Sequence, residues 1–267
     1  MGDYIRHREM PAGKEESMTE HFASWSGGAD STATALLALE HGDPLMGLVY
    51  CEVMFDEHTS GEVPEHAEFI HQVAIPWFEE HGVHVEVLRA EKTFCDYFYW
   101  PITKGRNVGK LHGFPMSSKG RCSIKRDCKL PPLRQFIRQH KDAIWYLGIA
   151  YDEDRRLKSM DSNAVSLLEK YRVTQEGARE ICKRYGLLSP IYEFAPRGGC
   201  FFCPNAKPGE LRHLRDNHPE LWKKLLKMQM DQRVVRPNSF GFDLNLEDYE
   251  NNFDFDDRQI TWEDLGL

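Results

Sequence analysis

The sequence has no long apolar run and no excess of positive charge. No stretch of its 267 residues is apolar enough to cross a bilayer, and the first twenty residues lack the apolar core of a secretory signal. The formal net charge is −8, which argues against a protein that coats nucleic acid, because such binding depends on neutralising phosphates. We therefore expect a cytoplasmic protein that makes no contact with a membrane.

Two familiar phosphate-binding loops are also missing. The chain contains neither G-x-x-x-x-G-K-[ST] nor G-x-G-x-x-G, so a kinase-type P-loop and a dinucleotide-binding fingerprint are both excluded. It has instead the stretch "WSGGADST" at residues 25–32, between an apolar approach and the helix-like run "ATALLALE".

This stretch has the residue types of an anion-binding loop. Gly27 and Gly28 permit close backbone approach, so that successive N–H groups can turn toward an anion. Ser26 and Ser31 add hydroxyl groups, and Asp30 can hold a magnesium ion. The alternative is a plain glycine turn in which Asp30 or Ser31 caps the helix.

Apolar runs and helical periods alternate along the first 150 residues, as in βαβ units. The predicted strands are "EHFASW" and residues 44–55, 83–90 and 143–150, and the predicted helices are "DSTATALLALEHG" and residues 64–82 and 130–142. We predict an α/β fold with a doubly wound, mostly parallel sheet, followed by a helical, cysteine-containing C-terminal part. A ligand loop is expected beyond the carboxyl end of a strand in such a sheet.

The predicted organisation has four parts. These are a flexible N-terminus (1–20), a nucleotide-binding α/β domain (21–160), a helical and cysteine-loop region packed on it (161–235), and an acidic C-terminal extension (236–267).

The seven cysteines favour a metal or redox role, because disulfides are rare in cytosolic proteins. "GGCFFCP" supplies Cys200 and Cys203 as C-x-x-C, and "RCSIKRDCK" supplies Cys122 and Cys128 among basic residues. Four thiolates suit zinc or a [4Fe–4S] cluster equally well. The alternative is a redox C-x-x-C with two unrelated cysteines. The other three lie in apolar contexts and are predicted core residues: Cys51, Cys95 and Cys182.

Taken together, these motifs resemble the phosphoadenosine phosphosulfate (PAPS) reductase-like family of the PP-loop ATP pyrophosphatase superfamily. "SGGADS" is similar to the SGGxDS signature, and "GRCSIKRDCK", "LGIAYDEDRR" and "GGCFFCP" follow in the family's order. The resemblance implies an adenine nucleotide alpha hydrolase-like fold that binds ATP or a related adenosine nucleotide with Mg²⁺. It also implies cleavage between the α phosphate and pyrophosphate.

The resemblance further implies residue roles. The family's G-I-x-x-x-E-x-x-R element matches Gly148, Ile149, Glu153 and Arg156, with Asp152 as a further magnesium or positioning group. The implied catalytic residues are Asp30, Glu153 and Arg156. The implied nucleotide-binding residues are Ser26, Gly27, Gly28, Asp30, Ser31, Gly148 and Arg156. The implied ligands of a [4Fe–4S] cluster, with Zn²⁺ as the alternative, are Cys122, Cys128, Cys200 and Cys203.

Three departures from the family pattern matter. No cysteine follows Cys203, so the E-C-G-[LI]-H nucleophile motif of the assimilatory reductases is absent. Ala29 stands where lysine is common in the phosphate loop, so Mg²⁺, the helix end and arginines from elsewhere are expected to compensate. The pair in "CSIKRDC" is wider than the adjacent cysteine pair of cluster-bearing reductases.

The predicted function is adenylylation of a substrate with release of pyrophosphate, in sulfur transfer. One alternative is reduction of a sulfonucleotide by an external thiol or by Cys122 or Cys128. Another is a non-catalytic nucleotide- and metal-binding module of a multiprotein system. The expected partners are a small anionic nucleotide and an acceptor, either a protein or a nucleic acid, and a homodimer is compatible with the sequence.

Overall fold

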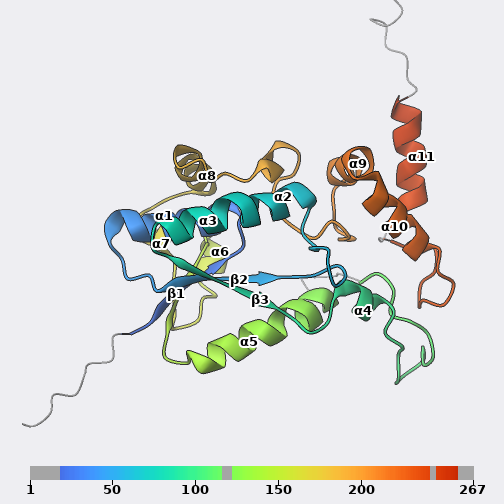
Figure 1. Ribbon diagram of the computed structural model, residues 1–267, viewed down its shortest axis with the longest axis horizontal. Helices are drawn as coiled ribbons and strands as arrows, with labels where there is room; N and C mark the ends of the chain where they lie inside the picture. Colours follow the sequence, from blue (N-terminus) through green and yellow to red (C-terminus); the bar gives the residue numbers. More distant parts are fainter. Residues whose placement is uncertain (1–18, 116–121, 241–244, 258–267) are drawn as a thin grey trace, which may run out of the picture.

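A five-stranded parallel sheet forms the centre of the molecule (Figure 1). The computed structural model describes residues 19–115, 122–240 and 245–257. The strand order is β3-β2-β1-β4-β5. The strands are β1 (His21–Trp25), β2 (Gly47–Glu52), β3 (His84–Arg89), β4 (Ile144–Leu147) and β5 (Ala164–Val165). All six residues of β2 are buried, as expected of a strand that is covered on both faces.

Helices cover both faces of this sheet, which confirms the predicted doubly wound α/β fold. One face carries α1 (Ala29–His41), a continuous helical segment, and two later helices, whereas the other face carries α5 (Leu130–Gln139) (Figure 1). The continuous segment consists of α2 (Pro64–Glu68), a π-helical stretch (Phe69–Ala74) and α3 (Ile75–Glu80). The two later helices are α7 (Leu167–Lys170) and α8 (Gln175–Arg184), and the larger hydrophobic core lies between all of these and the sheet.

Local sequence explains the ends of the main helix and the irregularity of the segment that follows it. Gly42 ends α1 in the left-handed conformation, with φ of 67°, which glycine adopts at little cost. The π-helical stretch directly precedes α3, whose second residue is Pro76. Proline has no N–H to donate to the preceding turn. The predicted helices over 64–82 and 130–142 are therefore confirmed to within a few residues.

A second hydrophobic core joins the C-terminal helices to segments from the middle of the chain. Phe94, Phe202 and Trp222 lie at its centre and are almost fully buried. Its elements are α4 (Phe94–Phe98), a π-helical stretch (Lys125–Lys129), α9 (Pro208–Asn217), α10 (Pro219–Gln229) and α11 (Leu246–Asp257). In Figure 1 these C-terminal helices lie beyond one end of the sheet.

The chain also forms two short helical segments, α6 (Asp154–Leu157) and a 3-10 turn (Pro190–Glu193). Phe240 and Phe253 are buried in the second core, so aromatic side chains hold part of the segment 236–267 to the molecule. Within the described residues, none of the helices is long and apolar enough to span a membrane.

Candidate nucleotide-binding site and cysteine cluster

The sheet reverses its strand order at β1, and the candidate loop lies at this point. From β1 the chain first builds outward to β2 and β3, and later returns to place β4 on the other side of β1. Ser24 of β1 is paired with Leu147 of β4, so Ser26 and Gly148 leave the sheet at neighbouring carboxyl ends. Ligands of open α/β sheets bind in the crevice at such a switch point.

Two glycines allow the backbone to pack closely here. Gly27 has φ of 72°, and a Cβ at this position would lie 2.5 Å from Cγ1 of Ile70. A Cβ on Gly148 would lie 2.6 Å from the backbone nitrogen of Ser31. The end of β4 is therefore pressed against the first turn of α1, and no larger residue fits without a backbone shift.

Hydroxyl groups hold the loop in a closed shape. The Ser31 Oγ accepts a hydrogen bond from the Ser26 N–H (3.2 Å) and donates one to the Gly28 carbonyl (3.0 Å). The Ser26 Oγ lies 3.2 Å from the same Ser31 Oγ. Gly28 is the N-cap of α1 and no side chain caps this helix. Neither Asp30 nor Ser31 is therefore the N-cap of α1, and this part of the plain-turn alternative is wrong.

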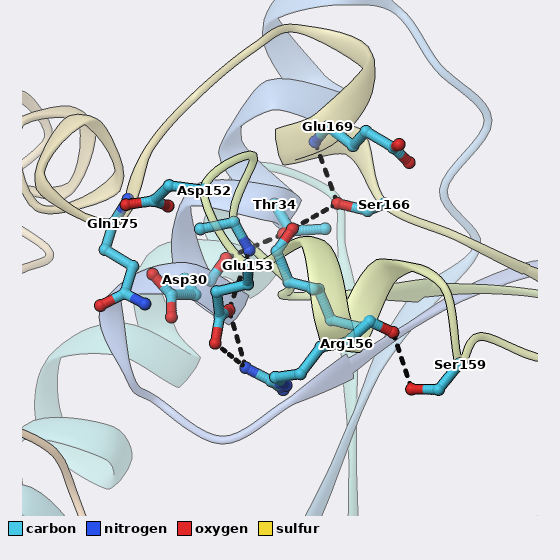
Figure 2. A network of polar contacts seen from close by, with 11 residues as sticks. Asp30, Thr34, Asp152, Glu153, Arg156, Ser159, Ser166, Glu169 and Gln175 are labelled. Carbon is cyan, nitrogen blue, oxygen red and sulfur yellow. Dashed lines mark hydrogen bonds and ion pairs between the residues drawn. The ribbon is translucent and has the colours of Figure 1, made fainter.

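The carboxylate of Asp30 faces other acidic groups. Burial and the negative charge of Glu153 raise the pKa of Asp30 to about 6, against the opposing effect of Arg156 and Arg179. Asp152 also raises this pKa. Within the part of the chain that the structure describes, the Asp30 carboxylate accepts no hydrogen bond, whereas its backbone carbonyl accepts one from Thr34 (2.8 Å). Figure 2 shows the Asp30 and Glu153 carboxylates side by side. Hard oxygen donors in such an arrangement suit Mg²⁺.

A short turn after β4 orients Glu153 and Arg156 (Figure 2). The Arg156 Nη1 donates to both Glu153 carboxylate oxygens, at 2.8 Å each, and the Ala150 N–H donates to Glu153 Oε2 at 3.1 Å. Arg156 remains 56% exposed and Glu153 only 16%. The structure thus brings the three predicted catalytic residues together, with a guanidinium at the rim that can turn toward an anion.

Two residues of this site carry no signal in the sequence. The Tyr192 hydroxyl accepts a hydrogen bond from the Ala29 N–H at 2.7 Å, across 163 residues of sequence. The Arg179 guanidinium lies 5.0 Å from the centre of the Tyr192 ring and lowers the pKa of Asp30. Arg156 and Arg179 are thus two arginines from outside the loop whose positive charges act on Asp30.

His66 connects the phosphate loop with the cysteine loop. Its Nε2 lies 3.1 Å from the Ser26 carbonyl oxygen, and its Nδ1 lies 2.8 Å from the Ser189 Oγ. A Cβ on Gly198 would lie 2.9 Å from the same Nε2. Burial lowers the pKa of His66, so the imidazole is neutral at pH 7 and acts as a fixed spacer between the two loops.

The four candidate metal-binding cysteines lie in one region, around Cys122. The charge of Cys122 raises the pKa of Cys128, Cys200 and Cys203, although burial is the main cause in each case. Cys128 is fully buried, and its pKa is raised to about 12. Cys200 and Cys203 also line a cavity of about 110 Å³. The four cysteines that the sequence singled out therefore lie near enough for the charge of Cys122 to act on the other three.

The spacing of these thiols bears on which metal they suit. Among the described residues, no three of the cysteine sulfurs lie within 4.8 Å of one another. Tetrahedral zinc, with Zn–S bonds of about 2.3 Å, holds its sulfurs about 3.8 Å apart. Zinc and a [4Fe–4S] cluster are both retained as alternatives for these four thiols. Of the predicted core cysteines, Cys51 and Cys182 are buried and Cys95 is half-buried.

Comparisons with known proteins give two similarities. No family model matches the sequence. The chain is 26% identical over 217 residues to the uncharacterized protein MJ0066 of Methanocaldococcus jannaschii, covering 75% of this chain and 39% of that protein. It therefore spans about two fifths of the length of this curated relative.

The chain is also similar to a solved structure, the U34-tRNA thiolase NcsA from Methanococcus maripaludis with its [4Fe-4S] cluster. The TM-score is 0.41 at 14% identity, over 88% of this chain and 81% of that chain. A similarity of this size does not establish a family or an activity.

Proposed function

We propose that this chain binds an adenosine nucleotide with Mg²⁺ at the loop 26–31 and adenylylates an acceptor with release of pyrophosphate, in a sulfur-transfer reaction. The observation that carries the proposal is the Asp30 carboxylate. It lies in the first turn of α1, directly after a glycine loop at the switch point of the sheet, beside Glu153 and two arginines. The motif order that resembles the PAPS reductase-like PP-loop family supports the same conclusion.

In this proposal each group has a distinct task. The N–H groups of Gly27, Gly28, Asp30 and Ser31 and the Ser26 hydroxyl hold the β and γ phosphates at the positive end of α1, whereas the Ala29 N–H donates to Tyr192. Asp30, with Glu153 and Asp152, holds Mg²⁺, which supplies positive charge to the departing pyrophosphate. Arg156 and Arg179 stabilise the negative charge that builds up as the bond between the α and β phosphates breaks.

The cysteines supply the sulfur-transfer part of the proposal. Burial keeps the Cys128, Cys200 and Cys203 thiols protonated near pH 7 when no metal is bound, and a protonated thiol is a weak nucleophile. Metal coordination removes these protons, so the chemistry of the thiols favours a [4Fe–4S] cluster over a bare redox pair. For the same reason Cys128 is a poor nucleophile for sulfonucleotide reduction, the alternative function.

Product analysis tests this function. The anaerobically purified chain is incubated with Mg²⁺ and ATP labelled on the α phosphate, and the labelled product is identified. Without an acceptor we expect AMP and pyrophosphate from slow transfer to water. Once an acceptor is added, we expect faster release of pyrophosphate with the label on the acceptor, and AMP only after sulfur or water displaces it. Asp30→Asn abolishes this turnover, whereas Asp154→Asn, the same change at an exposed residue in the first turn of α6, leaves it unchanged.

Other products would identify a different activity. ADP with inorganic phosphate contradicts the proposal, because it places the cleavage between the β and γ phosphates. Sulfite released from PAPS favours the reductase alternative. Nucleotide binding that yields no product with any acceptor favours the non-catalytic module.

A further inference from the structure

A second group of metal-ligating side chains lies where α2 meets the turn between α9 and α10. Glu65 stands in the first turn of α2, His213 belongs to α9, and His218 immediately precedes α10. The Glu65 Oε1 lies 2.6 Å from Nε2 of His213 and 2.9 Å from Nε2 of His218. Among the described residues, no other trio of histidine, cysteine or acidic side chains brings its ligand atoms within 4.8 Å of one another.

Ordinary ion pairing does not account for this arrangement. Both imidazoles point their Nε2 at the same oxygen of Glu65. The other oxygen, Oε2, is buried and has no hydrogen-bond partner within the described part of the chain. An unpartnered buried carboxylate oxygen is costly, and a cation between the three side chains would remove that cost.

We propose that Glu65, His213 and His218 bind a divalent transition-metal ion. Two imidazole nitrogens and one carboxylate are the ligand set of zinc sites that keep a position open for water, and of iron(II) sites of the same composition. All three side chains are partly exposed, between 21% and 27%, so water or a small ligand can reach the ion. The site shares no residue with the four cysteines and does not depend on the proposed nucleotide chemistry.

Neighbouring side chains already hold one of the imidazoles in place. The ring of Phe194 stacks on His213 at 3.5 Å, and the Asn217 Nδ2 lies 3.2 Å from Nδ1 of His213. A metal on Nε2 requires the ring proton to sit on Nδ1. The Asn217 Nδ2 also donates to the His213 carbonyl at 3.0 Å. If the Asn217 amide turns by half a rotation, its Oδ1 accepts the hydrogen bond from Nδ1 and the bond to this carbonyl is given up. Such outer partners fix the tautomer and orientation of metal-bound histidines.

Because of its position, an ion at this site would also connect two parts of the fold. In Figure 1 the start of α2 faces α9, and the Val63 N–H just before α2 donates to the Gly199 carbonyl of the cysteine loop at 3.3 Å. A metal at Glu65 therefore fastens the helix that follows β2 to the helices of the second core, next to the cavity that Cys200 and Cys203 line.

Titration of the full chain with Co²⁺ tests the proposal, after the cysteine site has been loaded with its own metal. We expect the ligand-field absorption bands of bound Co²⁺ without the charge-transfer band of a thiolate ligand. Glu65→Gln, His213→Gln and His218→Gln should each weaken binding at least about 100-fold, and Asn217→Ala about 10- to 100-fold. His84→Gln, which alters an exposed histidine between Glu79 and Glu86, should leave the affinity unchanged. An unchanged affinity in Glu65→Gln, or a thiolate band, overturns the proposal.

A measurement on the unmodified chain guards against variants that fail to fold. Diethyl pyrocarbonate modifies accessible imidazoles, and peptide mass spectrometry reports the extent for each histidine. With Zn²⁺ as the probe, His213 and His218 should both be protected and His84 should not. Equal modification of all three with and without Zn²⁺ would show that no ion binds there.

Discussion

At the residue scale, the ionisation of Asp30 connects stability with function. Its pKa is raised to about 6 because the carboxylate is half-buried beside Glu153. An acid held in this way destabilises the folded chain when it is charged, and a cation at the same place relieves the repulsion. Carboxylates of this kind are common where a protein binds a metal or carries out catalysis.

Replacing this carboxylate should therefore stabilise the chain as it removes activity. The unfolded chain loses the Asp30 proton near pH 3.8 and the folded chain near pH 6, so stability contributed by the neutral form is lost as the pH rises between these values. The full pKa shift corresponds to a change of about 3 kcal/mol in the free energy of unfolding. Because Asp30 is only half-buried, solvent screening reduces this change to about 1 kcal/mol. Urea unfolding of Asp30→Asn should show this gain at pH 8 and none at pH 4. A variant less stable than the wild type at pH 8 would contradict this reasoning.

Gly148 gives a second prediction at this scale. In Gly148→Ala the new Cβ would lie 2.6 Å from the Ser31 nitrogen, so β4 and the first turn of α1 must move apart. Overpacking of this kind costs about 1–3 kcal/mol, and thermal unfolding should report it together with weaker nucleotide binding. Gly209→Ala is the matched control, because nothing lies within 4 Å of its new Cβ. Equal losses in both variants would rule out the close contact as the cause.

At the scale of elements, the sequence predicts the long helices and buried strands well and the short elements poorly. β2 and the helical segment over 64–80 have clear apolar patterns, and each lies where its pattern predicted. By contrast α4 and α6 have five and four residues, too few to show a period. The loop 26–31 and the turn that carries Glu153 were found because their motifs are local.

Residues that join the site from distant elements escaped prediction. Arg179 comes from α8 and Tyr192 from the 3-10 turn after it. Both reach α1 only because α8 packs against that helix in the larger core. Glu65 and His213 are likewise brought together only by the packing of their helices, because they are 148 residues apart in sequence. No local pattern signals contacts that depend on the packing of whole helices.

Arg179 brings a positive charge from α8 to the neighbourhood of Asp30. Arg179→Met keeps much of the contact with the Tyr192 ring but removes the positive charge near Asp30. We expect nucleotide binding to weaken about 10-fold, corresponding to about 1.4 kcal/mol, with little change in thermal stability. Arg184→Met on the same helix, whose guanidinium pairs with Glu40 instead, should bind nucleotide like the wild type. If both variants bind nucleotide with equal affinity, Arg179 does not contribute to nucleotide binding.

At the scale of the whole molecule, two separate hydrophobic cores stabilise different parts of the chain. The sheet and its covering helices form the first. Cys128 lies within the second, with α9 and α10, and Cys122 and Cys200 pack against it. His66 and the pairing of Glu62 with Cys200 connect the two. If the cysteines hold a metal, as proposed, it would stabilise the second core directly and the loop 26–31 only through these contacts.

Removal of the cysteine-bound metal should loosen one core selectively. After chelation, we expect hydrogen–deuterium exchange to increase at least about 10-fold in α4, α9 and α10 while β1 and β2 stay protected, because opening is local to the core that loses its ligands. Peptide-resolved mass spectrometry of anaerobically purified and chelated protein measures this. Exchange that rises equally in the sheet would indicate that the two cores unfold as one unit.

The binding of Mg·ATP tests the central claim most directly, and isothermal titration calorimetry measures it for the wild type, Asp30→Asn and Asp154→Asn. We expect Mg²⁺-dependent binding to the wild type and to Asp154→Asn. In Asp30→Asn we expect binding weaker by at least about 100-fold, or about 2.7 kcal/mol. Equal affinity in all three proteins, or binding that is indifferent to Mg²⁺, would contradict a phosphate site at the loop 26–31.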